Sequence, residues 1–143
     1  MAANTDPIYT LEPEVANNGT TGMNQLITAA ANDYTGIDAD VSLVFTAGAN
    51  GSFVQRLRFK AGGTNVATVA RIYINNGSSP GTATNNLFYG EISLPATTAS
   101  ATVATVDLDY PMNFAIPATF RIYVGLATAV AAGWVVTPVA GNY

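Results

Sequence analysis

Histidine and cysteine are both absent from the 143-residue sequence, and only 10% of the residues are charged. Without imidazole, no side chain has an ordinary pKa suited to general base catalysis near neutral pH. Without cysteine, there is no thiolate to act as a nucleophile or as a soft metal ligand. These absences remove the commonest catalytic groups. The lack of cysteine leaves the redox compartment open, because a domain of this size does not need disulfides.

The charges that are present are mostly acidic. Nine acids against five bases give a net charge of −4 and a pI near 4.3, which argues against general affinity for nucleic acid or for an anionic membrane. The surface must therefore consist largely of Thr, Asn, Ser, Gly and Ala, and a surface with so few charges is only weakly protected against association. A large shared interface and a neutral, Thr-rich β surface explain this composition equally well.

Long hydrophobic runs are also missing. The most apolar region, from Phe120 to Val139, is interrupted by charged, glycine and proline residues, so no 18-residue apolar stretch could cross a bilayer. The sequence Met1–Pro7 has no basic start and no apolar segment behind it. We therefore expect synthesis without Sec-type export and no association with membranes.

Two regions differ in composition. Residues 1–22 are rich in turn-forming residues, including the run Asn17–Gly22, and we interpret them as an N-terminal arm with a short strand at Ile8–Leu11. The arm either orders against a neighbouring subunit or is a loose terminus. Residues 23–143 are expected to form a single domain.

Within that domain, strand-like segments recur about every ten residues, and Gly, Asn and Pro clusters separate them. No segment of ten or more residues shows helical spacing of apolar residues. The sheets should therefore be antiparallel, and the fold an all-β, two-sheet β-sandwich of jelly-roll type, with an immunoglobulin-like sandwich as the alternative. The expected strands are Met23–Ala29, Val41–Ala47, Ser52–Ala61, Val66–Asn75, Leu87–Leu94, Ala101–Leu108, Met112–Ile116, Thr119–Leu126 and Trp134–Val139.

Period-two alternation in two of these strands predicts which side chains face the core. In Ser52–Ala61 the inward set is Phe53, Leu57 and Phe59, and the opposite set is Val54, Arg56, Arg58 and Lys60. In Val66–Asn75 the inward set is Val66, Ala70, Ile72 and Ile74, and the opposite set is Ala67, Val69, Arg71 and Tyr73. Phe120, Ile122 and Trp134 complete the predicted core.

The acidic residues suggest little chemistry. Asp38/Asp40 and Asp107/Asp109 have a spacing that places both carboxylates on one face of a strand, where they could help to hold Ca²⁺. Neither pair has the further ligands of a calcium loop, so solvated acids at strand ends are the favoured interpretation. A glycosidase pair of carboxylates is the weaker alternative. We predict no catalytic, cofactor-binding or metal-binding residue and no enzymatic activity.

The basic residues form a more informative pattern, because all five lie in expected strands. If these strands share a sheet, its outer face carries a basic stripe with two tyrosines beside it. Arg and Tyr are enriched at protein interfaces, whereas charges on outer strands can also simply prevent unwanted pairing. Nucleic-acid binding is a third and weaker possibility. The candidate interface residues are Arg56, Arg58, Arg71, Tyr73, Arg121 and Tyr123.

The second half of the chain resembles structural proteins of tailed-bacteriophage virions. The segments that carry this resemblance are Arg71–Gly77, Leu87–Pro95, Leu108–Asn113, Arg121–Leu126 and Ala131–Val136. The resemblance implies a small jelly-roll protein on the capsid surface, made in the host cytoplasm: a decoration, or cement, protein. Such a protein would form a homotrimer and bind the major capsid protein.

The other function we consider is a receptor- or carbohydrate-binding β-sandwich of a phage tail fibre or spike. It requires an exposed aromatic platform, for which the candidates are Tyr73, Tyr89, Tyr110 and Tyr123.

Overall fold

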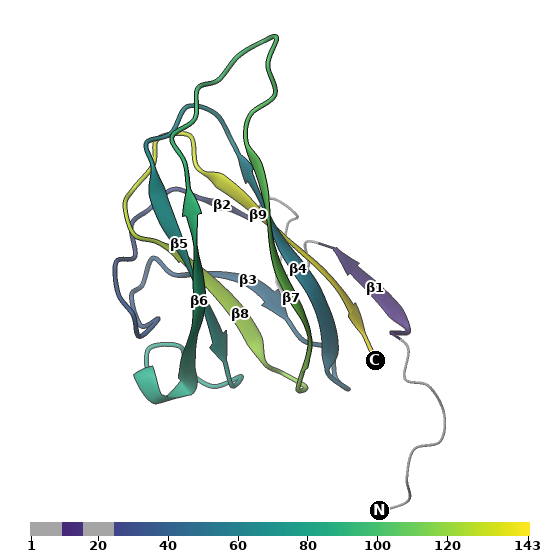
Figure 1. Cartoon of the computed structure of the whole chain (residues 1–143). Coiled ribbons are helices and arrows are strands. Elements are labelled where there is room, and N and C mark those ends of the chain that lie inside the picture. The colour runs from purple at the N-terminus through teal and green to yellow at the C-terminus, as the bar shows by residue number, and fades with distance from the viewer. Residues whose placement is uncertain (1–9, 16–24) are drawn as a thin grey trace, which may run out of the picture.

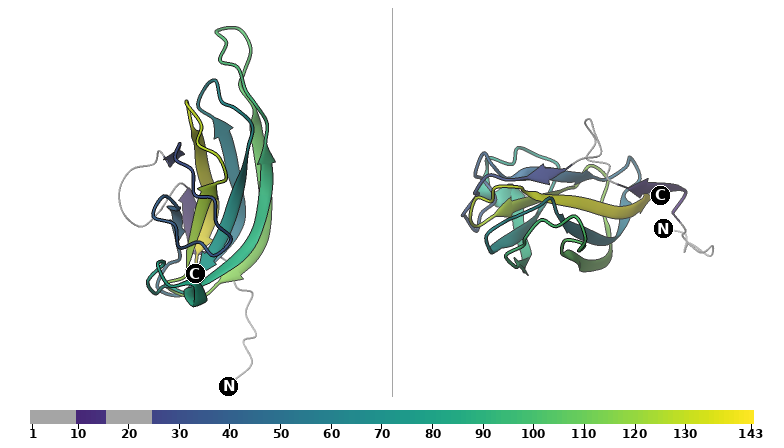
Figure 2. Two further views of the ribbon diagram at one scale, coloured as in Figure 1. Left: turned by 90° about the vertical axis from the view of Figure 1, so that its left-hand side faces the viewer. Right: turned by 90° about the horizontal axis from the view of Figure 1, so that it is seen from above.

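Two antiparallel sheets packed face to face make up the described part of the chain (Figures 1 and 2). The computed structural model describes residues 10–15 and 25–143. Apart from one short 3-10 helix, η1 (Ala83–Asn85), the regular elements of these residues are strands. The strands are β1 (Glu12–Val15), β2 (Leu26–Ile27), β3 (Ser42–Thr46), β4 (Ser52–Ala61), β5 (Thr68–Asn75), β6 (Asn86–Leu94), β7 (Asp107–Ile116), β8 (Arg121–Leu126) and β9 (Trp134–Asn142).

The strand order is simple when it is followed from the middle of the chain. The first sheet has the order β1-β9-β4-β7, with β2 also paired to β9, and the second sheet has the order β3-β8-β5-β6. β5 pairs with β6, β4 with β7, β3 with β8 and β2 with β9, all antiparallel. The chain therefore folds like one long hairpin with its tip between β5 and β6. The predicted all-β, antiparallel two-sheet sandwich is confirmed.

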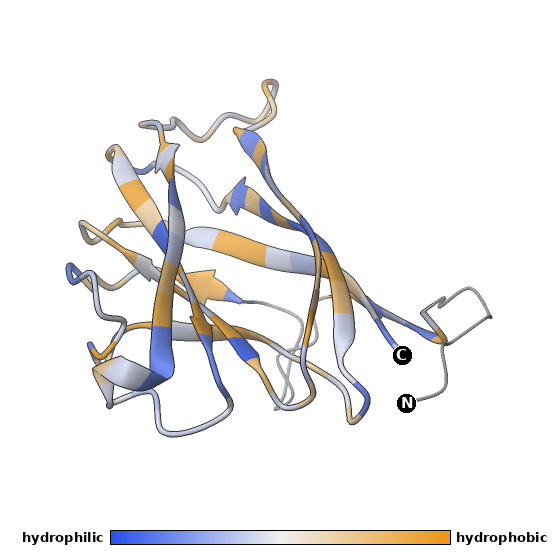
Figure 3. Ribbon diagram, turned by 60° about the horizontal axis from the view of Figure 1, so that its bottom comes forward, coloured by the Kyte–Doolittle hydropathy of each residue, from blue (hydrophilic) through white to orange (hydrophobic). Residues whose placement is uncertain are grey.

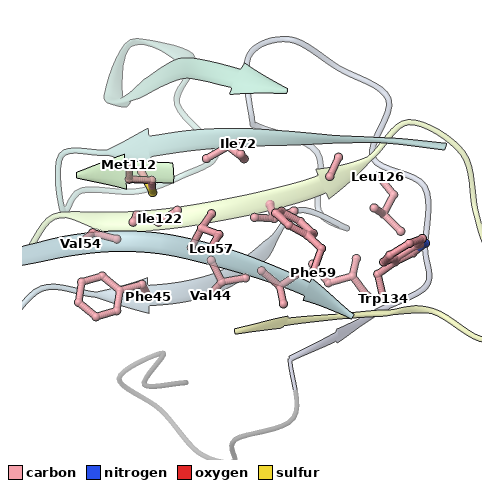
Figure 4. Close-up of a cluster of buried hydrophobic side chains, with 14 of the residues drawn as sticks. Val44, Phe45, Val54, Leu57, Phe59, Ile72, Met112, Ile122, Leu126 and Trp134 are labelled. Carbon is pink, nitrogen blue, oxygen red and sulfur yellow. The ribbon is translucent and has the colours of Figure 1, made fainter. Parts of the chain in front are cut away.

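The core lies between the two sheets and is built from both (Figure 4). Leu57, Phe59 and Trp134 point inward from the first sheet, and Ile72 and Ile122 meet them from the second. Burying a large apolar side chain of this kind contributes about 1.5–3 kcal/mol. Hydrophobic and hydrophilic bands alternate along the charged strands of the first sheet (Figure 3), as expected for strands with one buried face.

A β-bulge changes the predicted core at one position. The register of β4 shifts between Val54 and Arg56 against both of its neighbours. Because an extra residue reverses the alternation, Val54 is fully buried in the core, while Phe53 is half-buried on the outer face. The prediction that Phe53 faces inward was wrong. In the next strand Ala70, Ile72 and Ile74 face inward as predicted, but Val66 lies before β5 and is exposed.

The segment from residue 95 to residue 116 also differs from the prediction. Instead of separate strands at Ala101–Leu108 and Met112–Ile116, there is one strand, β7, and residues 95–106 form a loop that projects beyond the sandwich (Figures 1 and 2). Pro111 sits inside β7, which is possible because β7 is an edge strand and its N–H groups need not all pair. The Val and Thr residues of the loop resemble a strand, but Val103 at its tip is 67% exposed.

Only part of the predicted N-terminal arm belongs to the described residues. β1 pairs with the chain's own β9, with Glu12 opposite Asn142 and Val15 opposite Val139. Glu14 also accepts a hydrogen bond from the Asn142 side chain at 2.8 Å. Of the strand expected at residues 8–11, residues 8 and 9 lie outside the described part, and Thr10 and Leu11 precede β1. The remainder of the arm, residues 1–9 and 16–22, also lies outside it.

Candidate interaction surface

The five basic residues do lie in strands, but not in one sheet. Arg56, Arg58 and Lys60 are in β4 of the first sheet, whereas Arg71 is in β5 and Arg121 in β8 of the second. The single basic stripe expected from the sequence is therefore wrong. It depended on these strands sharing a sheet, and strand order is set by the long-range topology.

On the first sheet the two arginines are paired with acids of β7, whereas Lys60 Nζ donates to the carbonyl oxygen of Thr105 at 2.8 Å. Arg58 Nε donates to Asp107 Oδ1 at 2.8 Å, and Arg56 Nε lies 3.4 Å from Asp109 Oδ1. The hydrogen bond and charge of Arg58 hold the pKa of Asp107 below its usual value. Ion pairs this exposed contribute little to stability, but they explain the Asp107/Asp109 spacing, since opposite charges pair across adjacent strands.

On the second sheet three of the predicted interface residues, Arg71, Tyr73 and Tyr123, are buried. Arg71 is 6% exposed and Tyr73 is fully buried, because residues 32–36 lie over this outer face of β5. Arg71 Nη1 donates to Asn32 Oδ1 at 2.6 Å, and Tyr73 Oη donates to the carbonyl oxygen of Asp33 at 2.7 Å. Desolvation, together with the charge of Asp33, raises the pKa of Tyr73 to about 12. Strand phase correctly placed both side chains on the outer face, but this face is covered.

The two other predicted interface residues of the second sheet, Tyr123 and Arg121, do not form an exposed surface with Arg71 and Tyr73. Tyr123 lies directly opposite Tyr73 across β5 and β8 and is also buried. Arg121, at the start of β8, reaches the carbonyl oxygen of Ser78 at 3.5 Å. Arg56, Arg58, Arg71, Tyr73, Arg121 and Tyr123 therefore do not form one exposed surface.

The loop over β5 is ordered by the carboxylate of Asp33. Its oxygens accept hydrogen bonds from the backbone N–H groups of Thr35, Gly36 and Asp38. Burial is the largest single influence on the pKa of Asp33 and raises it, but the hydrogen bonds from these N–H groups together outweigh burial and lower the pKa. The hydrogen bonds of the loop therefore favour the ionised carboxylate.

This ordered loop presents Tyr34 to solvent. The Tyr34 side chain is 60% exposed, yet its ring lies 4.1 Å from the guanidinium carbon of Arg71, and its hydroxyl accepts a hydrogen bond from Arg71 Nη2 at 3.0 Å. Phe88 packs edge-on against the same ring at 5.4 Å between centroids. The buried arginine already fixes the position of this exposed ring. A partner that binds the ring therefore causes little further loss of side-chain entropy.

Exposed hydrophobic side chains gather around Tyr34. Ten large hydrophobic side chains are exposed in the described residues, and half of them lie in residues 34–37 or 87–89. The Asn86 side chain joins the two segments by donating to the carbonyl oxygens of Thr35 and Gly36 at 3.1 and 3.2 Å. We call this surface the β6 patch; it consists of Tyr34, Ile37, Leu87, Phe88 and Tyr89.

The β6 patch continues onto the side of the sandwich where β6 and β7 lie opposite each other. The ring of Tyr89 lies 5.2 Å from that of Phe114 and 6.3 Å from that of Tyr110, both in β7. A pocket of about 340 Å³ opens beside Leu87, and its apolar lining is Ile74, Leu87 and Phe120. A concentration of exposed apolar side chains of this kind marks interaction sites.

Acidic residues border the β6 patch. Asp33 and Asp38 lie in its loop and Glu91 lies in its strand, whereas Asp40 lies just before β3 at the other edge of the sheet. Residues 32–40 and 86–94 contain no Lys or Arg. Glu91 Oε2 lies 3.7 Å from Arg71 Nε and remains half exposed. Asp38 accepts a hydrogen bond from the backbone N–H of Asp40. The patch therefore has an aromatic and aliphatic centre and a negative rim.

The sequence-based reasoning missed most of this surface. It named Tyr89 and Tyr110 as possible platform residues but passed over Tyr34, Ile37, Leu87 and Phe88. One signal was present: Leu87, Phe88 and Tyr89 are three consecutive large apolar residues, so the strand must carry apolar side chains on both faces. The contribution of Tyr34 and Ile37 had no sequence signal, because their loop is brought to β6 by the tertiary structure.

Comparisons with protein-family models, with curated proteins and with solved structures gave no match. No helix among residues 10–15 and 25–143 has the length and hydrophobicity needed to span a membrane. In the same residues, no three Asp or Glu side chains come together as a possible metal site.

Proposed function

We propose that this protein is a non-enzymatic structural protein of a tailed-bacteriophage virion, a decoration or cement protein that binds the assembled head and stabilises it. The observation that carries this proposal is the β6 patch, an exposed aromatic surface on a molecule whose total charge content is only 10%. A surface with few charges and a hydrophobic centre is suited to covering another protein surface. The resemblance of residues 71–143 to virion proteins supports the same class.

The proposal extends to the fold type. The nested pairs β2–β9, β3–β8, β4–β7 and β5–β6 support the proposal of a jelly roll, an eight-stranded double sheet common in capsid proteins. β1 is then an additional strand on the β9 edge.

The mechanism would be thermodynamic linkage between binding of this protein and assembly of the shell. A protein that binds only the assembled shell stabilises that state by mass action. The proposed homotrimer presents three copies of one weak contact to a symmetric lattice of the major capsid protein, so avidity multiplies the effect. Neither catalysis nor a cofactor is required.

Cosedimentation with purified phage heads tests this function. The protein should pellet with intact, undecorated shells and not with unassembled coat subunits. The variant Phe88→Ser should stay in the supernatant, whereas Val103→Ser, at an exposed site on the projecting loop, should pellet like the parent protein. If the parent protein stays in the supernatant with intact shells, the cement function is wrong.

Binding to a receptor glycan is the second candidate, and one observation favours it. Tyr34, Phe88 and Tyr89 expose aromatic rings beside Glu91 and Asn32, and such rings can stack on sugars. Of the four tyrosines considered from the sequence, Tyr73 and Tyr123 are buried and cannot take part. Glycan-array signal that disappears in Tyr34→Ser, without binding to shells, would favour this alternative.

A further inference from the structure

Three of the four sheet edges have features that discourage pairing with another strand. β1 contains Pro13, and β7 contains Pro111 together with Asp107 and Asp109. β3 has five residues, and its register with β8 is irregular. Proline, charge, short length and bulges are the devices by which natural sheets prevent their edges from pairing.

The fourth edge, β6, has few such features. It is nine residues long, contains neither Pro nor Lys, and carries a single charge, on Glu91. A bulge at Tyr89 leaves Gly90–Leu94 regular. In the described part of the chain, the backbone of Leu87–Leu94 forms no hydrogen bonds beyond its ladder with β5. The outer backbone groups of β6 are thus free to pair.

We propose that β6 binds an extended segment of another protein, which adds to the second sheet as a fifth strand. The N–H and C=O groups of β6 would supply the main-chain hydrogen bonds, and alternate side chains of the added strand would face the two sides of the sheet. On the inner side, the pocket beside Leu87 can take an apolar side chain. On the outer side, Phe88 and Tyr34 form the contact surface.

Charge defines the partner further. Asp33, Asp38 and Glu91 make the surroundings of the patch negative, so a partner strand with Lys or Arg beside its apolar residues is complementary. A second copy of this chain is disfavoured, because pairing β6 with itself would bring two negative rims together. The partner is therefore a different protein with a basic, apolar, extended segment.

A synthetic peptide tests this edge directly. In the probe, Val and Thr alternate between terminal lysines, and the matched control peptide has terminal glutamates instead. The lysine peptide should slow amide hydrogen exchange in Leu87–Leu94 and should bind about tenfold more tightly than the control, the effect of two ion pairs of ordinary strength.

Two pairs of protein variants locate the site. Glu91→Lys, in β6 itself, should abolish most of the preference for the lysine peptide, whereas Glu12→Lys, the same charge change on the β1 edge, should not. Phe88→Ser should weaken binding about tenfold, and Val103→Ser should leave it unchanged. Thermal unfolding checks that each variant is folded, and Glu91→Lys remains informative if Phe88→Ser is not.

Absence of exchange protection in β6, equal binding of the two peptides, or protection confined to another edge would each overturn the proposal. Neither peptide experiment requires a viral shell. If the protein binds capsids but the peptide does not protect β6, the virion function stands and strand addition at β6 is wrong. If the peptide protects β6 but the protein does not bind capsids, strand addition stands and the virion function is wrong.

Discussion

Single polar residues, one buried (Asn65) and one half-buried (Asn86), hold loops of this molecule in place. The Asn65 side chain accepts hydrogen bonds from the N–H groups of Ala132 and Gly133 at 2.8 and 2.9 Å, and donates to the Gly133 carbonyl at 3.0 Å. The Asn86 side chain donates to the Pro80 carbonyl at 2.7 Å as well as to the loop over β5. Each amide satisfies backbone groups that a buried loop would otherwise leave unpaired.

Trp134 is the largest fully buried side chain, and its replacement tests the core. We expect Trp134→Ala to lower the free energy of unfolding by about 3–5 kcal/mol, because the cavity loses contacts from both sheets. Val103→Ala, at an exposed site, should change it by less than about 0.5 kcal/mol. Urea denaturation followed by circular dichroism measures both. Equal midpoints for the two variants would place Trp134 outside the core.

The pH dependence of stability tests Asp33. The pKa of Asp33 is lower in the folded protein than its ordinary value of about 3.9. The ionised carboxylate therefore stabilises the folded state above about pH 3.9, and this stabilisation is lost as the pH falls through the lower pKa of the folded protein. Asp33→Asn should lack this part of the acid dependence, whereas Asp40→Asn should retain it. Unfolding free energies measured across the acid range would show the difference. Parallel curves for Asp33→Asn and the parent protein would contradict the assignment.

At the level of elements, the side where β6 and β7 face each other is closed by aromatic rings rather than by backbone pairing. Tyr89 contacts Tyr110 and Phe114, and Gly90 leaves room for the Tyr110 hydroxyl, which a Cβ at that position would overlap. The two edge strands are therefore joined through side chains, which leaves the backbone edge of β6 unpaired.

Gly90→Ala tests this packing. The added methyl group should cost about 1–3 kcal/mol of stability, because it displaces Tyr110. Tyr110→Phe removes the overlapping hydroxyl, so the double variant should be more stable than the sum of the two single changes predicts. A double-mutant cycle on unfolding free energies gives the coupling. Strict additivity would mean that the two side chains do not meet.

For the whole molecule, one core spans both sheets, so neither sheet can keep its buried face without the other. We expect a single cooperative unfolding transition. The fluorescence of Trp134, the only tryptophan in the sequence, reports on the first sheet, and far-ultraviolet circular dichroism reports on all strands. The two thermal curves should coincide. Separate midpoints would show that the sheets unfold independently.

Strand positions were largely predictable from the sequence. Ser52–Ala61 was predicted with the bounds it has in the structure, and Leu87–Leu94 within one residue, because turn residues and period-two alternation are local properties. The outward position of Phe53 was not predictable, since a bulge depends on the neighbouring strands. The Val and Thr residues at 101–106 look like a strand, but among the described residues their only backbone hydrogen bond to a strand runs from the Ala61 N–H to the Val106 carbonyl oxygen.

The sequence by itself determined the class of the fold, the direction of strand pairing, and the absence of histidine and thiol chemistry. Only the tertiary structure decided which outward-facing residues reach solvent. Arg71 and Tyr73 point away from the core as predicted, but a loop about 40 residues earlier covers them and brings Tyr34 beside Phe88. The physical reason is that side-chain direction follows from the local backbone, whereas exposure depends on what distant segments pack above it.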